Sequence, residues 1–169
     1  RDRIYSWYSW LNYPGKGLMV ANTPWSGWYN VTAPVWVAAH TTQFTDLDWR
    51  YLGGGACARL SGGGSFVSLV SPLVDGGNNS TTRDLTVVVE TMGATSPQTV
   101  RFSRDTSIRA KPLTLWTTNQ TDVFVYRGAV ATDEDGGFIV TIPADELWTI
   151  TTTTGQSKGT AAIPQQVSF

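Results

Sequence analysis

The chain has 169 residues, of which 41% are hydrophobic and 15% charged, and its formal net charge at pH 7 is −1. This balance offers no electrostatic surface for a nucleic acid or an anionic membrane, so we expect no nucleic-acid partner. The longest apolar runs are far shorter than the roughly 20 residues that cross a bilayer, so we expect no transmembrane segment.

Residues suited to metal or redox chemistry are scarce. Cys57 is the single cysteine and His40 the single histidine. Cys57 lies between two alanines, which is typical of a buried structural thiol. His40 falls inside a predicted helix and is interpreted as structural. We therefore expect no metal site and no cofactor.

Several sequence motifs bear on the cellular location. Four Asn-x-Ser/Thr motifs begin at Asn30, Asn78, Asn79 and Asn119. Such motifs accept N-linked glycans and favour the secretory pathway, with a secreted, lysosomal or vacuolar destination. Residue 1 is Arg, which suits a mature or cut chain.

The first 45 residues alternate helix and strand. Apolar side chains at positions 4, 7, 8 and 11 have the spacing of one helical face, and Pro14-Gly15 ends that pattern. The run 17–21 is short, continuous and apolar, which predicts a strand covered on both faces. A loop over 22–29 follows it.

A second helix is predicted from Ala33 to about Phe44. Thr32 is its candidate N-cap, and Pro34 lies in the first turn, where the missing N–H costs nothing. Helix, strand, loop and helix together are typical of the end of a parallel α/β domain. An isolated end of that kind is expected to expose a group of apolar residues, namely Leu18, Met19, Val20, Val35 and Trp36.

From residue 46 the pattern changes to short strands separated by turns rich in Gly, Asn and Asp. The main candidates cover 65–73, 84–92, 99–103, 113–118, 122–129, 137–142 and 146–153. This spacing predicts an antiparallel β-sandwich over residues 46–169. The unbroken run Val87–Val89 predicts a central strand.

Several of these segments resemble the galactosylceramidase family of glycoside hydrolases. They include Pro24-Trp25-Ser26-Gly27, the run Ala39-His40-Thr41-Thr42-Gln43-Phe44-Thr45, and the run from Asp84 through Glu90-Thr91-Met92. The parts from His40 to Phe44 and from Glu90 to Met92 are the most specific. Further matches are Gly63–Val67 and Asp145–Thr152, and all of them occur in the family's order between about residues 4 and 159.

The resemblance implies a fold and a reaction. Residues 1–45 correspond to the C-terminal helix-strand-helix piece of a TIM (β/α)8 barrel, and residues 46–169 to the β-sandwich packed beside it. The implied activity is retaining hydrolysis of a β-galactosidic bond in a galactoside or galactolipid. The two catalytic glutamates belong to earlier barrel strands, so this chain alone is expected to be inactive. The implied partner is the remaining part of the barrel, as a second chain from the same precursor.

The resemblance also implies substrate-binding residues within this chain. Arg101 matches an arginine that the sandwich contributes to the galactose pocket, and Arg104 is the alternative match. Tyr13 matches a tyrosine at the entrance to the eighth strand. Trp25 and Ser26 follow that strand, where the active-site loops of such barrels lie.

The glutamates of the chain are interpreted as structural or solvated. These residues are Glu90, Glu134 and Glu146. None of them pairs convincingly with another as an acid/base couple.

Two other functions fit the residues. The aromatic content of 12% also suits a free-standing carbohydrate-binding sandwich, because flat rings stack on sugars. A purely structural sandwich that braces a barrel and contacts no ligand is the third reading.

Overall fold

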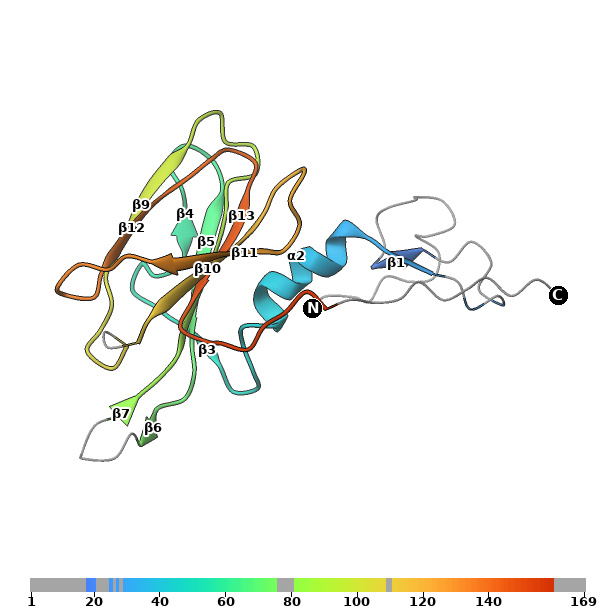
Figure 1. The fold of residues 1–169 in the computed structure, drawn as a ribbon. Helices are drawn as coiled ribbons and strands as arrows, with labels where there is room; N and C mark the ends of the chain where they lie inside the picture. Colours follow the sequence, from blue (N-terminus) through green and yellow to red (C-terminus); the bar gives the residue numbers. More distant parts are fainter. Residues whose placement is uncertain are drawn as a thin grey trace. The chain divides into compact units, whose positions relative to one another are not determined.

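The computed structural model describes residues 18–20, 25, 27, 29–75, 81–108 and 111–159. The chain forms two compact units, one joining Arg1–Ala38 to Ser157–Phe169 and the other covering Ala39–Gln156. Within the described residues the fold is mainly β, with antiparallel sheets and one α-helix (Figure 1). The helix predicted over 1–12 lies outside these residues.

The smaller unit contains a short hairpin and the start of the helix. Strand β1 (Met19–Val20) pairs antiparallel with β2 (Asn30–Val31), and α2 (Ala33–Thr42) follows. The predicted strand is therefore present, but its partner is antiparallel. Its predicted burial on both faces is wrong for this unit, because Met19 is 55% exposed.

The expected exposure of apolar residues is met in part. Leu18 and Met19 are exposed, whereas Val20, Val35 and Trp36 are half-buried. The ammonium group of Lys158 lies 5.0 Å from the centre of the Trp36 ring, which covers part of that side chain.

The larger unit is built on one large antiparallel sheet with the strand order β11-β10-β13-β8-β5-β3 and β4 also paired to β5. Its strands are β3 (Arg50–Tyr51), β4 (Ala58–Arg59), β5 (Ser65–Val70), β8 (Leu85–Glu90), β10 (Leu113–Thr118), β11 (Val125–Val130) and β13 (Leu147–Thr151). The predicted central position of the Val87–Val89 strand is confirmed, since β8 lies between β13 and β5.

Two smaller sheets complete this unit. Strand β9 (Gln98–Phe102) pairs with β12 (Phe138–Ile142), and β6 (Val74–Asp75) pairs with β7 (Thr81–Thr82). In Figure 1 the β6–β7 hairpin continues beyond one end of the large sheet.

The core lies between the large sheet and the β9–β12 pair. Val87, Val89 and Ile150 of the large sheet are at most 1% exposed, and Ile142 of β12 is fully buried with them. Phe102 stacks on Phe138 with ring centres 4.9 Å apart. Burial of each such side chain contributes roughly 1.5–3 kcal/mol, so this layer is the main source of stability.

The opposite face of the large sheet carries buried threonines and receives the end of α2. The fully buried His40 contacts Thr149 and Thr118, and the Phe44 carbonyl accepts a hydrogen bond from the hydroxyl of Thr86. Phe124 packs edge-on against the His40 ring at 5.3 Å between ring centres. His40 therefore has the structural role that the sequence predicted.

Cys57 differs from its prediction. The thiol is half-buried rather than buried, and its sulfur lies 3.4 Å from the carbonyl oxygen of Leu52. It also accepts a hydrogen bond from the Ser68 N–H at 3.5 Å.

Candidate functional site

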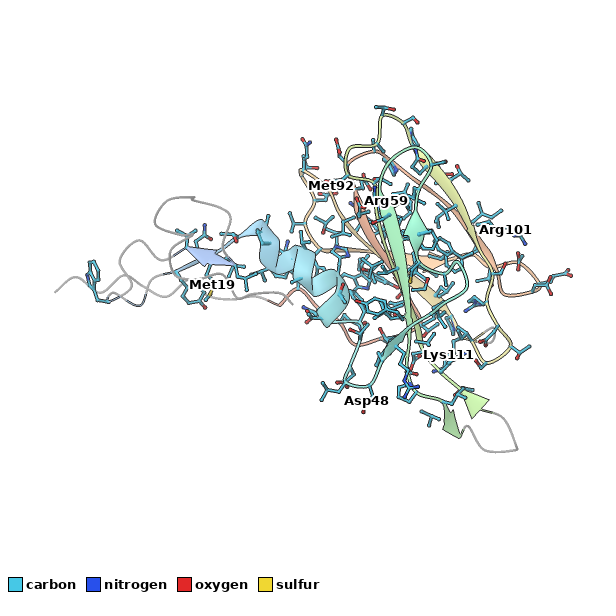
Figure 2. The ribbon with its side chains drawn as sticks, turned by 180° about the vertical axis from the view of Figure 1, so that it is seen from behind. Met19, Asp48, Arg59, Met92, Arg101 and Lys111 are labelled. Atoms are coloured by element: carbon cyan, nitrogen blue, oxygen red, sulfur yellow. The ribbon has the colours of Figure 1, made fainter. Side chains whose placement is uncertain are left out.

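Arg101 projects from the outer side of β9. It is paired with Ile139 of β12, and the neighbouring residue Phe102 points into the core. Because side chains alternate along a strand, Arg101 faces solvent, and its side chain is 60% exposed. Figure 2 shows it at the surface of the molecule. A cation in this position is available to a ligand.

A cavity of about 330 Å³ borders Arg101. Its apolar lining includes Phe66, Leu85 and Val87, and its polar lining includes Arg104 and Asp105 as well as Arg101. A hollow with an apolar wall and a few polar groups is the usual form of a small-molecule site, and this volume is at the lower end of that class.

Asp133 holds the guanidinium of Arg101. Its Oδ2 atom accepts a hydrogen bond from Arg101 Nη2 at 2.8 Å, in an exposed ion pair. The other carboxylate oxygen accepts the backbone N–H of Gly137 at 2.6 Å. Asp133 is not among the candidate residues predicted from the sequence. The Asp-x-x-Gly-Gly pattern from 133 to 137 indicates a turn but not its contact with Arg101.

Arg104, the alternative match, is only 5% exposed. Its guanidinium donates to the carbonyls of Gly136, Ile108 and Lys111, at 3.1 Å for Ile108 and 2.8 Å for Lys111. Burial lowers the pKa of the Arg104 guanidinium, and the negative charge of Asp133 opposes that shift. Arg104 therefore joins two loops and has far less surface to offer a ligand than Arg101.

The other predicted binding residues belong to the first 38 residues. Trp25 is 73% exposed. Tyr13 and Ser26 lie outside the described residues. Of the four residues, the larger unit contains Arg101 alone.

The two described glutamates with side-chain partners are engaged by neutral donors. Glu90 accepts the Ser65 hydroxyl at 2.6 Å and the Met92 N–H at 2.8 Å. Glu146 accepts the indole N–H of Trp148 at 2.5 Å and the side-chain amide of Asn119 at 3.3 Å. These contacts are those of carboxylates that tie neighbouring strands and turns together.

The described part of the chain has neither a metal-binding cluster nor a membrane-spanning helix. It contains no group of three or more His, Cys, Asp or Glu side chains placed to hold a metal ion. In the same residues no helix has the length and apolar character needed to cross a membrane.

Comparison with known proteins identifies the family. Residues 1–43 match the model of glycosyl hydrolase family 59. The chain is 34% identical to human galactocerebrosidase over 182 aligned residues, which cover 95% of this chain and 25% of the human protein. The chain belongs to the galactocerebrosidase family. Galactocerebrosidase from Mus musculus is similar to the same extent, at 35% identity over 95% of the chain and 25% of the mouse protein.

The match to these galactocerebrosidases extends across both units of the chain. The chain spans about a quarter of the length of its curated relatives. Among solved structures, the family 30 xylanase from Clostridium acetobutylicum has a similar fold, with a TM-score of 0.57 at 17% identity over 80% of this chain and 30% of the xylanase. At that identity the likeness concerns the fold alone.

Proposed function

We propose that this chain is the C-terminal portion of a retaining β-galactosidase of the galactosylceramidase type. Residues 1–45 would complete its TIM barrel, and residues 46–169 would form the sandwich beside the barrel. The observation that carries the proposal is the similarity to galactocerebrosidases over 95% of the chain. A galactoside or galactolipid is the proposed substrate.

The proposal assigns the bond cleavage to the rest of the protein. Retaining glycosidases use two carboxylates roughly 5 Å apart, one as nucleophile and one as general acid/base. Glu90 and Glu146 already accept two hydrogen bonds each from neighbouring groups, which disfavours either role. The catalytic pair is therefore assigned to barrel strands from the same precursor, carried by a second chain.

Arg101 is the proposed galactose ligand within this chain. A guanidinium carries a positive charge and presents several N–H donors in a fixed plane. One donor is directed at Asp133, and the exposed remainder of the group suits the hydroxyls of a sugar. Arg101 thus contributes binding and no proton transfer. Tyr13, Trp25 and Ser26 stay predicted contacts.

Substitution of Arg101 tests this role. In the complete enzyme, Arg101→Ala is expected to raise KM by about 10- to 100-fold, because hydrogen bonds from a charged group to substrate are lost. The kcat value is expected to change much less. Steady-state kinetics on a soluble galactoside, together with thermal unfolding, measure both effects.

Arg127→Ala provides the control, because Arg127 of β11 also forms an exposed ion pair, with Asp122 in the preceding loop. Unchanged KM in Arg101→Ala would contradict the proposal and leave a sandwich that only braces the barrel.

A carbohydrate-binding module without catalysis is the second candidate. The exposed ring of Trp25 favours it, since aromatic faces stack on sugars. Calorimetric titration of the isolated chain with galactose separates the two. Binding that Trp25→Ala removes supports the module, and the absence of binding at millimolar galactose excludes it.

The proposed location is the secretory pathway, with a lysosomal or secreted protein. Asn30 is exposed on β2, as a glycosylation site requires, and Asn119 lies half-buried in a turn. Asn78 and Asn79 lie outside the described residues. Mass analysis before and after enzymatic deglycosylation tests whether these motifs carry glycans.

A further inference from the structure

The loop between β11 and β12 is closed by Asp133. The Asp133 N–H donates to the Gly137 carbonyl at 2.8 Å, and the Gly136 N–H donates to the Asp133 carbonyl at 2.9 Å. The Oδ1 atom of Asp133 caps the Gly137 N–H. These three contacts fix the backbone and the carboxylate as one rigid turn.

Arg104 anchors this turn from the interior. It donates to the carbonyl of Gly136 within the turn and to the carbonyls of Ile108 and Lys111 in the loop after β9. Because Arg104 is buried, breaking its hydrogen bonds would leave buried polar groups unpaired, which is costly. The position of the Asp133 carboxylate is therefore set by the core of the protein.

Within the described residues, Arg101 has no comparable support from the interior. Its long side chain is 60% exposed, and it loses much rotational freedom when it adopts one orientation. Asp133 Oδ2 accepts from one terminal nitrogen of Arg101, so the ion pair anchors one end of the guanidinium and leaves its other donors for a ligand. If the Arg101 side chain is already oriented before a ligand binds, less conformational entropy is lost on binding.

We propose that Asp133 is a positioning residue that orients the Arg101 guanidinium for the hydroxyl groups of the sugar. This inference rests on the proposed function of Arg101. The two oxygens of the Asp133 carboxylate make different contacts. Oδ1 accepts the Gly137 N–H and holds the turn, and Oδ2 accepts from Arg101 and holds the cation that would bind the sugar.

The variant Asp133→Asn separates the two tasks in the complete enzyme. The amide oxygen of Asn can still cap Gly137, while the charge that pairs with Arg101 is lost. We expect KM for a soluble galactoside to rise roughly two- to fivefold, the size of effect that an exposed ion pair has. The value of kcat and the thermal midpoint are expected to stay close to those of the unsubstituted enzyme.

Asp122→Asn is the matched control. It removes the negative partner of Arg127 in an ion pair of similar exposure on β11. Its KM is expected to stay unchanged. A KM rise of the same size in this control would assign the effect to general surface charge and overturn the inference.

A double-mutant cycle with Arg101→Ala decides whether Asp133 acts through Arg101. If it does, Asp133→Asn changes KM in the original background and has no further effect in the Arg101→Ala background. Equal effects in both backgrounds, or no effect of Asp133→Asn, would overturn the positioning role while the function of Arg101 stands. No effect of Arg101→Ala would overturn the proposed function and, with it, this inference.

Discussion

Acidification from pH 6.5 to pH 4 is expected to lower the free energy of unfolding by roughly 3 kcal/mol through His40 alone. Burial lowers the pKa of His40 from 6.5 to about 4 in the folded protein. In the unfolded chain the imidazole regains its ordinary pKa. Between these two values the unfolded state binds more protons than the folded state, so stability falls as the pH falls.

The contacts of His40 suit the neutral ring that burial favours. The Thr149 hydroxyl donates to the His40 carbonyl at 2.8 Å, so its oxygen accepts from His40 Nδ1, also at 2.8 Å. In the neutral ring Nε2 is then an acceptor, and the Thr118 hydroxyl, whose oxygen also accepts the Phe124 N–H at 2.8 Å, donates to it at 2.7 Å. An added proton on Nε2 would meet that hydroxyl proton in a buried site.

Urea unfolding at a series of pH values measures this effect. The variant His40→Gln is expected to be less stable near neutral pH but to lack the steep loss between pH 6.5 and pH 4. Asp105 also contributes to the pH dependence of stability. Burial alone would raise the pKa of its carboxyl group, but hydrogen bonds from Ser107 and Arg83 lower that pKa below its ordinary value. The stability that Asp105 contributes is therefore lost at a more acidic pH than the range in which His40 acts. Identical pH slopes in the variant and the unsubstituted protein would contradict the account.

Gly64→Ala is expected to destabilise the sandwich by about 4 kcal/mol or more. The backbone of Gly64 has φ +95°, which side chains rarely adopt, and an added Cβ would lie 2.1 Å from the carbonyl oxygen of Glu90. That oxygen belongs to the end of β8, the central strand. The clash can be relieved only by moving the backbone of either segment.

Gly54→Ala separates the clash from the conformational effect. Gly54 also has a positive φ, of +67°, but nothing lies within 4 Å of an added Cβ. Its expected cost is about 1–2 kcal/mol, the usual penalty of a left-handed conformation. Chemical denaturation of the two variants measures the difference. Equal costs would show that the close approach of Gly64 to β8 is absent in solution.

The sequence predicted the long strands well because each carries its own local signal. All seven main candidates correspond to observed strands, and β10 has the predicted ends, Leu113–Thr118. The two-residue strands β3, β6 and β7 were missed, since two residues cannot display alternation. The antiparallel pairing of β1 with β2 was also missed, because it depends on a partner and not on the apolar run itself.

The candidate site could be predicted only in part for a similar reason. The exposure of Arg101 follows from its place on a strand between a half-buried Val100 and a buried Phe102. Its partner Asp133 lies 32 residues away along the chain, and the partner of His40 on β13 lies 109 residues away. No local pattern records such contacts, because they arise when distant strands come together.

The most direct test of the central claim is a structure of the complete enzyme with galactose bound. The account predicts that an Arg101 nitrogen lies about 3 Å from a galactose hydroxyl, within hydrogen-bonding distance, while Nη2 keeps its contact with Asp133. Galactose bound in the barrel with Arg101 well beyond hydrogen-bonding distance would contradict it. In that case the sandwich would have no part in recognising the sugar through this residue.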